Sequence, residues 1–226
     1  MSSTFADHAL NYYLNLTEPT GLPPGVSVLN PYRRPEVRDV VTQFYRKFYD
    51  DVAPRVFVLG INPGRYGAGV TGVSFTTPQA LATHCGIPNN LPPTPELSSK
   101  FIYKVVEAFG GPTAFYGKFF LSSLYPLALI REGKNYNYYD DRATTAALWP
   151  VVTETVRHQL TFGADRRVAV CLGRKNETYL RRLNDEQGFF GKILTLDHPR
   201  YILQYRSKEA DFFAETYIRT LGEIEN

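Results

Sequence analysis

The sequence predicts a single α/β domain of three layers, in which a central four-stranded parallel sheet lies between two layers of helices. Four short apolar runs typical of buried strands begin at Arg55, Phe119, Arg167 and Lys192. Segments with helical periodicity separate these runs, an alternation typical of parallel sheets that are covered on both faces. The sequence contains no repeat and no linker able to separate two domains, so we expect one domain over residues 1–226.

The N-terminal quarter is expected to be mainly helical. Residues 5–16 carry a short helical pattern, and the proline-rich stretch from Thr20 to Pro35 is interpreted as a connection. Pro35 suits the first position of a second helix. The apolar residues of that helix recur on one face, which should pack on the core: Val37, Val40, Val41, Phe44, Tyr45 and Phe48.

The middle of the chain combines one strand with a long glycine-rich loop. Residues 55–60 form the first predicted strand, and the loop follows it directly. Thr77 has the residue type of an N-cap for a short helix. The proline-rich residues 86–95 predict irregular structure, and another helix is expected to begin at Thr94-Pro95-Glu96.

One strand, a polar loop and a helix are expected next. The second strand begins at Phe119 and leads to Ser122-Ser123. Residues 131–141 are interpreted as a polar, tyrosine-rich loop. Asp140 or Asp141 should cap a helix over roughly residues 142–160, where Pro150 introduces a kink.

The third strand, Arg167 to Leu172, ends at Gly173 and precedes another helix. The fourth strand, Lys192 to Leu196, ends shortly before His198. Ser207 is expected to cap the closing helix, which extends to about Leu221.

The composition narrows the class of protein. Hydrophobic residues make up 43% and charged residues 21% of the chain, as in ordinary globular domains. No apolar run approaches the ~20 residues that span a bilayer. The N-terminus lacks the basic and apolar regions of a secretory signal, so we expect a cytoplasmic protein, associated with the nucleoid if the source is bacterial.

Charge and aromatic content leave the partner open. The net charge of +3 is compatible with a polyanionic partner without predicting one. Aromatic residues make up 14% of the chain, which either an aromatic core or a surface that stacks on bases would explain.

The cysteine and histidine content argues against a metal centre. Cys85 and Cys171 lie in unrelated contexts, and Cys171 is expected to be a buried thiol rather than part of a disulfide. Two cysteines and four scattered histidines do not supply the clustered ligands of a zinc or iron–sulfur site. We expect no metal and no cofactor.

The ends of the four predicted strands should meet at one edge of the sheet. They carry Asn62, Ser123, Gly173 and His198. The glycine-rich loop is neither a Walker P-loop nor a G-x-G-x-x-G fingerprint, and no G-x-S-x-G surrounds Ser123. The remaining groups suit a reaction with a dissociative transition state. An amide would position water, and a histidine would stabilise charge on the departing group.

Three segments carry a resemblance to a known family. The first is Gly60-Ile61-Asn62-Pro63-Gly64 with Gly67 and residues 71–75, the second is His198-Pro199, and the third is the strand over residues 120–127. These segments and their order along the chain resemble the motifs of SMUG-type uracil-DNA glycosylases. The chain is identified as a divergent member of the uracil-DNA glycosylase superfamily. The resemblance covers nearly the whole chain and implies the fold of that superfamily.

The resemblance also implies roles for individual residues. Asn62 would position the attacking water, His198 would stabilise the leaving base, and Phe75 would stack on the flipped base. Other residues at the base are expected to be Gly60, Ile61, Pro63, Gly64, Gly67, Ala68, Gly69 and Ser123. Pro199, Arg200 and Tyr201 are candidates for the DNA wedge or for contacts with the DNA backbone.

The implied activity is that of a monofunctional glycosylase without a cofactor. The enzyme would flip uracil out of single- or double-stranded DNA and leave an abasic site. One chain is sufficient for such chemistry, so we expect a monomer. The alternative from another class is a non-catalytic nucleic-acid or nucleoside binder with the same fold, against which the presence of both Asn62 and His198 argues.

Ser123 departs from the family pattern, which usually has His-Asn at positions 122–123. A serine hydroxyl either donates or accepts a hydrogen bond, which favours looser base selection that includes xanthine or hypoxanthine. The alternative is that Ser123 is only a small residue beneath another recognition element. The segment after His198 also lacks the family's Ser-Pro-Arg continuation. For Tyr136, Tyr138 and Tyr139, a packed loop is favoured over contact with DNA.

Overall fold

Four parallel strands form the central sheet of the structure, a computed structural model that describes residues 3–225. The strand order is β3-β2-β6-β7. The inner strands are β2 (Arg55–Gly60) and β6 (Ala164–Leu172), and the edges are β3 (Phe119–Ser123) and β7 (Lys192–Leu196). Gly60 pairs with Ser123, and Leu172 pairs with Leu196. The predicted parallel sheet is confirmed, and its carboxyl ends lie at one edge.

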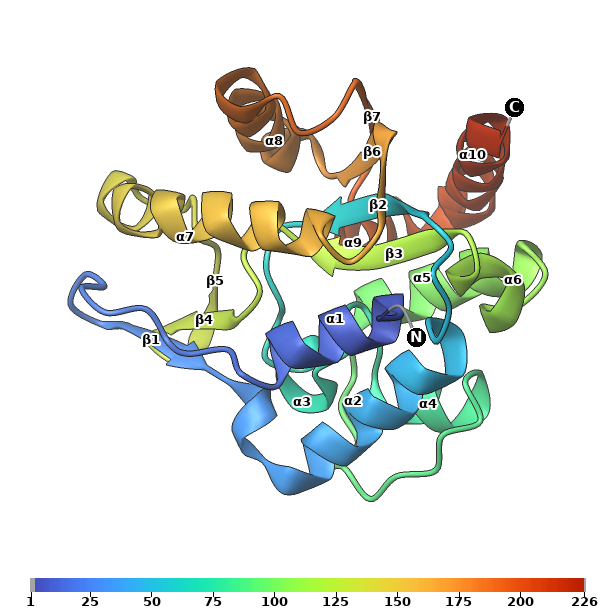
Figure 1. The fold of residues 1–226 in the computed structure, drawn as a ribbon, viewed down its shortest axis with the longest axis horizontal. Helices are drawn as coiled ribbons and strands as arrows, with labels where there is room; N and C mark the ends of the chain where they lie inside the picture. The colour runs from blue at the N-terminus through green and yellow to red at the C-terminus, as the bar shows by residue number, and fades with distance from the viewer. Residues whose placement is uncertain (1–2, 226) are drawn as a thin grey trace.

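Helices cover both faces of this sheet (Figure 1). On one side lie α7 (Arg142–Leu160) and α8 (Arg174–Gln187), and on the other lie α1 (Phe5–Tyr13), α2 (Pro35–Phe48) and α4 (Pro78–Thr83). The predicted apolar face of α2 is buried against the core. These helices confirm the three-layer αβα architecture.

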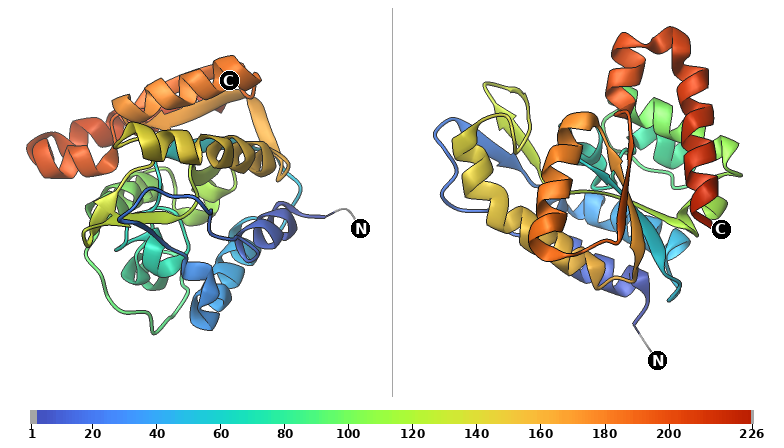
Figure 2. Two further views of the ribbon diagram at one scale, coloured as in Figure 1. Left: turned by 90° about the vertical axis from the view of Figure 1, so that its left-hand side faces the viewer. Right: turned by 90° about the horizontal axis from the view of Figure 1, so that it is seen from above.

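Three further helices pack against one another beside the sheet. They are α5 (Leu97–Ala108), α9 (Pro199–Tyr205) and α10 (Ala210–Gly222). Figure 2 shows the chain turning back after α9, so that α10 runs beside α5. Two short helices, α3 (Ala68–Thr71) and α6 (Pro112–Tyr116), lie in the connections.

A small antiparallel sheet was not predicted. It consists of β1 (Val26–Leu29), β4 (Ala128–Arg131) and β5 (Lys134–Tyr136), in the order β1-β4-β5. The interpretation of residues 20–35 as a plain connection and of 131–141 as a loop was therefore wrong. Each strand is only three or four residues long and forms through pairing with distant residues. A tight turn at Glu132 and Gly133, both with positive φ, joins β4 to β5.

Several predicted helix boundaries also need correction. The first turn of α5 begins after Glu96, and the short helix α6, which opens at Pro112, was not predicted. Residues that follow His198 form α9, which the sequence did not reveal. Ser207 begins a short 3₁₀ helix and does not cap α10, which starts at Ala210. The caps at Thr77 and Asp141 are confirmed, since each side chain accepts a backbone N–H at the start of its helix.

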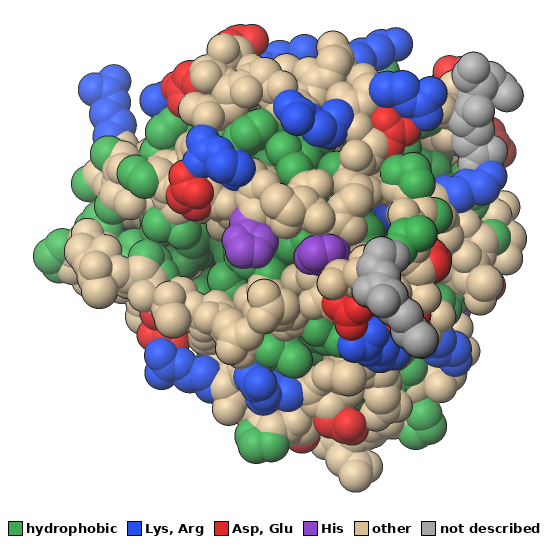
Figure 3. Space-filling view, viewed as in Figure 1, with side chains coloured by type: hydrophobic (Ala, Val, Ile, Leu, Met, Phe, Trp, Pro, Cys, Tyr) green, Lys and Arg blue, Asp and Glu red, His purple; other side chains and the backbone are tan. Residues whose placement is uncertain are grey.

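Aromatic side chains fill much of the core, which confirms the first of the two explanations of their abundance. Phe57 and Phe120 meet in the sheet with ring centroids 4.9 Å apart. Other fully buried aromatics surround them: Phe5, Tyr49, Phe101, Phe115, Tyr116, Phe119, Tyr125, Tyr138 and Tyr217. Basic and acidic side chains are interspersed over the face shown in Figure 3. None of the described helices is long and apolar enough to cross a membrane.

Candidate active site at the carboxyl edge of the sheet

A cavity of about 750 Å³ opens where the parallel strands end. It brings together Asn62 after β2, Ser123 at the end of β3 and His198 after β7, with Phe75 from the glycine-rich loop. Other expected site residues that line it are Ile61, Pro63, Gly64, Ala68, Arg200 and Tyr201. Gly60, Gly67, Gly69 and Pro199 are not among the residues that line the cavity.

The Asn62 amide is held by the backbone of the segment that follows β4. Its Nδ2 donates to the carbonyl of Tyr136 at 3.0 Å and to that of Pro63 at 3.2 Å. Its Oδ1 accepts the backbone N–H of Tyr138 at 3.2 Å. Both N–H donors are therefore occupied, and one lone pair of Oδ1 remains to accept a further hydrogen bond. An amide fixed in this way is able to orient a water molecule through Oδ1.

A buried asparagine, Asn176, supports the Asn62 amide indirectly, through Tyr138 and Leu59. The Tyr138 hydroxyl donates to Oδ1 of Asn176 at 3.3 Å, and Nδ2 of Asn176 donates to the carbonyl of Leu59 at 3.2 Å. Asn176 is fully buried at the start of α8. It thereby ties the segment that carries Tyr138 to the end of the strand that carries Asn62.

His198 is the N-cap of α9, and its ring is held in one tautomer. Its Nδ1 accepts the backbone N–H of Arg200 at 3.1 Å, which leaves the ring proton on Nε2. Burial, and secondarily the charge of Arg200, lower the pKa of His198 to about 4. The ring is consequently neutral at pH 7 and offers one N–H donor. Gly173 makes room for it, since a Cβ at Gly173 would lie 3.3 Å from the His198 Cβ.

Phe75 has a backbone conformation that is unfavourable for its residue type. Its φ of 54° lies in the left-handed region, which costs about 1 kcal/mol for a residue with a side chain. Its ring lies over the bare backbone of Gly60, where an added Cβ would come within 2.6 Å of Cζ. The ring centroid is 6.0 Å from that of His198. Phe75 thus forms an aromatic wall next to the histidine.

Ser123, the last residue of β3, lines the cavity. The residue is 5% exposed, and its backbone carbonyl accepts a hydrogen bond from Gln159 at 3.4 Å. The hydroxyl of the preceding Ser122 is instead bonded to Tyr13 at 3.0 Å, away from the cavity. Of the two serines, Ser123 is therefore the one placed to meet a ligand.

The glycine-rich loop packs too closely for side chains at two positions. A Cβ at Gly69 would lie 2.7 Å from the carbonyl oxygen of Gly64, and one at Gly67 would lie 2.1 Å from Oε2 of Glu96. The loop is also joined to the small sheet, because Arg65 donates its backbone N–H to Asn135 at 3.0 Å. The backbone contact explains why glycine is needed at position 69, whereas at Gly67 the neighbour is the flexible side chain of Glu96.

Basic and aromatic side chains surround the mouth of the cavity. Arg65 lies over the ring of Tyr66 at 4.4 Å, and Tyr201 and Tyr205 of α9 pair with centroids 5.7 Å apart. Both α9 tyrosines are substantially exposed. Lys134 and Arg200 also line the cavity. Such a rim suits a nucleic-acid strand, through phosphate contacts and stacking.

Sequence reasoning missed several residues of the site. Lys134 and Asn135 arrive on the unpredicted hairpin, and Tyr205 arrives on the unpredicted α9. Glu96 was seen only as part of a helix start, although it lines the cavity. Pro95-Glu96 before an apolar helix was the available signal, but a carboxylate at a helix start is ordinarily a capping group.

The thiols and carboxylates do not suggest a cofactor. Cys85 and Cys171 are free and buried, and burial raises the pKa of both thiols. Within residues 3–225, no three His, Cys, Asp or Glu side chains are grouped as metal ligands.

Comparison with known proteins identifies the family. The model of the uracil DNA glycosylase superfamily matches residues 46–222. The crystal structure of wild-type Pedobacter heparinus SMUG2 is similar over 100% of both chains, with a TM-score of 0.95 and 39% sequence identity. The sequence matches none of the curated proteins with which it was compared. The resemblance to SMUG-type enzymes is confirmed, and the chain belongs to the uracil DNA glycosylase superfamily.

Proposed function

We propose that the protein is a monofunctional DNA glycosylase that hydrolyses the N-glycosidic bond of uracil and of other deaminated bases, leaving an abasic site. One observation carries the proposal. An anchored amide, Asn62, and a neutral histidine, His198, face the same cavity from the ends of two parallel strands. The family assignment supports the same reaction class.

Water is the proposed nucleophile, and Asn62 orients it. Cleavage of an N-glycosidic bond leaves positive character on the sugar, so the attacking water needs positioning more than deprotonation. The free lone pair of Asn62 Oδ1 accepts a hydrogen bond from the water and directs the water oxygen toward the anomeric carbon. As the C–O bond forms and the C–N bond breaks, the water gives up one proton, which the departed base anion or the solvent takes up. The backbone bonds from Tyr136 and Tyr138 fix that direction before substrate arrives.

His198 stabilises the base as it leaves with the bonding electrons. Its Nε2–H donates to a carbonyl oxygen of the base, and this hydrogen bond strengthens as negative charge develops there. A histidine whose pKa is about 4 does not act as a proton donor at neutral pH. Its contribution is therefore a fixed hydrogen bond.

Phe75 and Ser123 form the proposed base pocket. The Phe75 ring provides a stacking surface, and the Ser123 hydroxyl meets the base edge as either donor or acceptor.

The substitution Ser123→Asn gives this position the side-chain amide that is usual in the family. It should raise the ratio of uracil to xanthine cleavage by about tenfold, since an amide with a fixed donor and a fixed acceptor selects one base edge. Unchanged selectivity would reject recognition by Ser123.

The rim of the cavity is the proposed contact with the DNA strand. Arg65, Lys134 and Arg200 lie where the phosphates that flank a flipped nucleotide would be held. Tyr201 projects from α9 and, with Pro199 and Arg200, belongs to the segment proposed to fill the space that the flipped base leaves.

An incision assay tests the proposal. Oligonucleotides with one uracil, xanthine or hypoxanthine, single- or double-stranded, are incubated with the protein and then treated with alkali. We expect strand breaks at the uracil only after alkali. Binding without abasic product on every substrate would instead support the non-catalytic binder, and breaks without alkali would refute the monofunctional mechanism.

A further inference from the structure

A carboxyl group without a partner lies in the wall of the proposed catalytic cavity. Glu96 immediately precedes α5, and its side chain makes no capping bond to that helix. Its Oε2 is inaccessible to solvent and has no hydrogen-bond partner within the described chain. A buried polar atom without a partner costs about 1–3 kcal/mol, so its retention calls for an explanation.

The position of this carboxyl is set by the glycine-rich loop. A Cβ at Gly67 would lie 2.1 Å from Oε2 and 2.4 Å from Oε1 of Glu96, so the group rests directly on the bare backbone of Gly67. Oε1 is also 3.6 Å from the position of a Cβ at Gly64. Glu96 lines the same cavity as Asn62 and His198.

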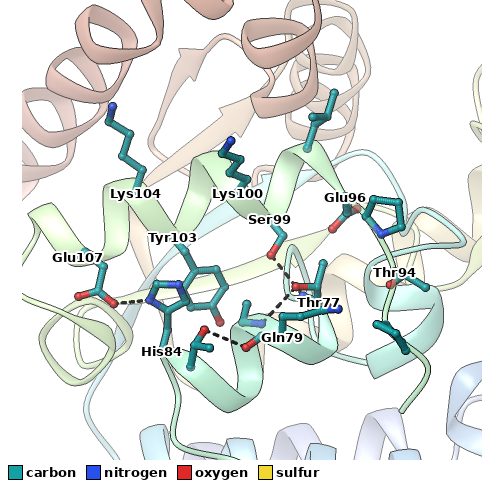
Figure 4. Close-up of a pocket in the computed structure, with 15 residues that line it drawn as sticks. Thr77, Gln79, His84, Thr94, Glu96, Ser99, Lys100, Tyr103, Lys104 and Glu107 are labelled. Carbon is teal, nitrogen blue, oxygen red and sulfur yellow. Dashed lines mark hydrogen bonds and ion pairs between the residues drawn. The ribbon is translucent and has the colours of Figure 1, made fainter. Parts of the chain in front are cut away.

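A second, open cavity of about 700 Å³ between α4 and α5 does not supply the missing partner. Figure 4 shows Glu96 at one end of that cavity, apart from the pair formed by His84 and Glu107 at the other. The His84 Nδ1 and the Glu107 carboxylate satisfy each other at 2.7 Å. Glu96 is thus the carboxyl that stays unpaired beside the catalytic cavity.

We propose that Glu96 is a further substrate-contacting residue, whose carboxyl rotates off the Gly67 backbone when a base is bound and donates a hydrogen bond to a carbonyl oxygen of that base. This inference rests on the proposed function. Every deaminated base carries carbonyl oxygens, and negative charge gathers on them as the base leaves. A donor from Glu96 would act there together with the Nε2–H of His198, and its effect would be largest in the transition state.

The charge state of Glu96 agrees with this role. Burial, opposed by the charge of Arg200, raises the pKa of the Glu96 carboxyl to about 7. The titratable groups that face the same cavity are Arg65 and Tyr66 of the glycine-rich loop, Lys134 of β5, and His198, Arg200, Tyr201 and Tyr205 at α9. On the side of the second cavity, α5 adds Lys100 and Lys104. Bound phosphates would neutralise the cations and favour the neutral carboxyl further.

Cleavage should therefore depend on pH through Glu96. The donor is present below the pKa, and ionisation both removes it and places a negative charge beside the departing anion. We expect the single-turnover rate on single-stranded uracil DNA to fall as pH rises above about 7.

The test compares Glu96→Gln and Glu96→Ala with wild type under single-turnover conditions from pH 5.5 to 9. The Glu96→Gln variant keeps an N–H donor, so its single-turnover rate should stay within a few-fold of the wild-type rate at pH 6. Because glutamine does not ionise, the rate of this variant should not decline above pH 7. Alanine should lower the rate by about 10²-fold at pH 6. Glu215→Gln, at an exposed position of α10, is the matched control and should reproduce the wild-type profile.

The outcomes separate this inference from the proposed function. Wild type that is inactive on every deaminated base refutes the proposed function itself. If wild type is active and both Glu96 variants keep its rate and its pH profile, the contact is refuted. Equal loss of melting temperature and of rate in both variants, with the pH profile unmoved, would show that Glu96 only supports the loop.

Discussion

At the scale of single residues, the site depends on bare backbone as much as on side chains. Phe75 reaches its place over Gly60 only because that position lacks a Cβ. The strained backbone of Phe75 is tolerated because residues 71–76 form a buried turn, in which the Thr71 hydroxyl donates to the carbonyl of Thr76 at 2.8 Å. Strained backbone conformations of this kind are typical of ligand-binding sites, which agrees with a role for the Phe75 ring in contacting a ligand.

Gly60→Ala tests the placement of this wall. The new methyl would lie 2.6 Å from Cζ and 3.0 Å from Cε2 of Phe75, which forces the ring to move into the cavity. We expect a folded protein whose single-turnover rate on uracil DNA falls by at least about tenfold, because a displaced stacking surface misplaces the base. Gly222→Ala at the end of α10, where a Cβ meets nothing within 4 Å, is the control. An unchanged rate in Gly60→Ala would show that Phe75 does not contact the base.

At the scale of elements, the hairpin and α8 cooperate to hold Asn62. Backbone groups from β5 and the segment after it bind the amide, and Asn176 at the start of α8 fixes Tyr138 of that segment. Asn62 itself follows the first predicted strand, so its position at the sheet edge was predictable. Its partners were not, because a three-residue strand such as β5 forms only through pairing with β4.

Asn176→Ala should weaken catalysis more than binding. Loss of the amide frees the Tyr138 hydroxyl and the Leu59 carbonyl, and the segment that orients Asn62 becomes mobile. We expect the single-turnover rate to fall by about tenfold while the dissociation constant for uracil DNA changes less than threefold. Asn184→Ala on the same helix removes hydrogen bonds to Phe190, far from Asn62, and should lower stability alone. Matching losses of rate in the two variants would argue against a positioning role.

At the scale of the whole molecule, the three layers were predictable because buried parallel strands and amphipathic helices leave strong patterns. The central strands and α2 followed from such patterns, and so did the meeting of Asn62, Ser123 and His198 at one edge. The helix α7 was predicted from the aspartate cap that precedes it. The small sheet and α9 lacked comparable signals, because short elements depend on tertiary contacts. Glu96 was overlooked for the same reason, since only the folded loop covers its carboxyl.

The pH dependence of the free energy of unfolding should reveal the raised pKa of the Glu96 carboxyl. Its pKa is raised from 4.5 to about 7 on folding, so ionisation destabilises the native state as pH rises through that interval. Glu96→Gln removes this penalty. The variant should match wild type near pH 4.5 and exceed it at pH 8 by about 3 kcal/mol in the free energy of unfolding. His198 contributes equally to both proteins and cancels. Urea denaturation at the two pH values checks this, and an equal difference at both would contradict the buried neutral carboxyl.

The release of free uracil from DNA is the measurement that tests the central claim most directly. Wild type, Asn62→Ala and His198→Ala are each mixed in excess with a single-stranded oligonucleotide that contains one uracil, and the free base is quantified over time. We expect wild type to release one uracil per strand, and each variant to be slower by about 10²-fold or more while still binding the DNA. Release at the wild-type rate by both variants, or no release by wild type, would contradict the account.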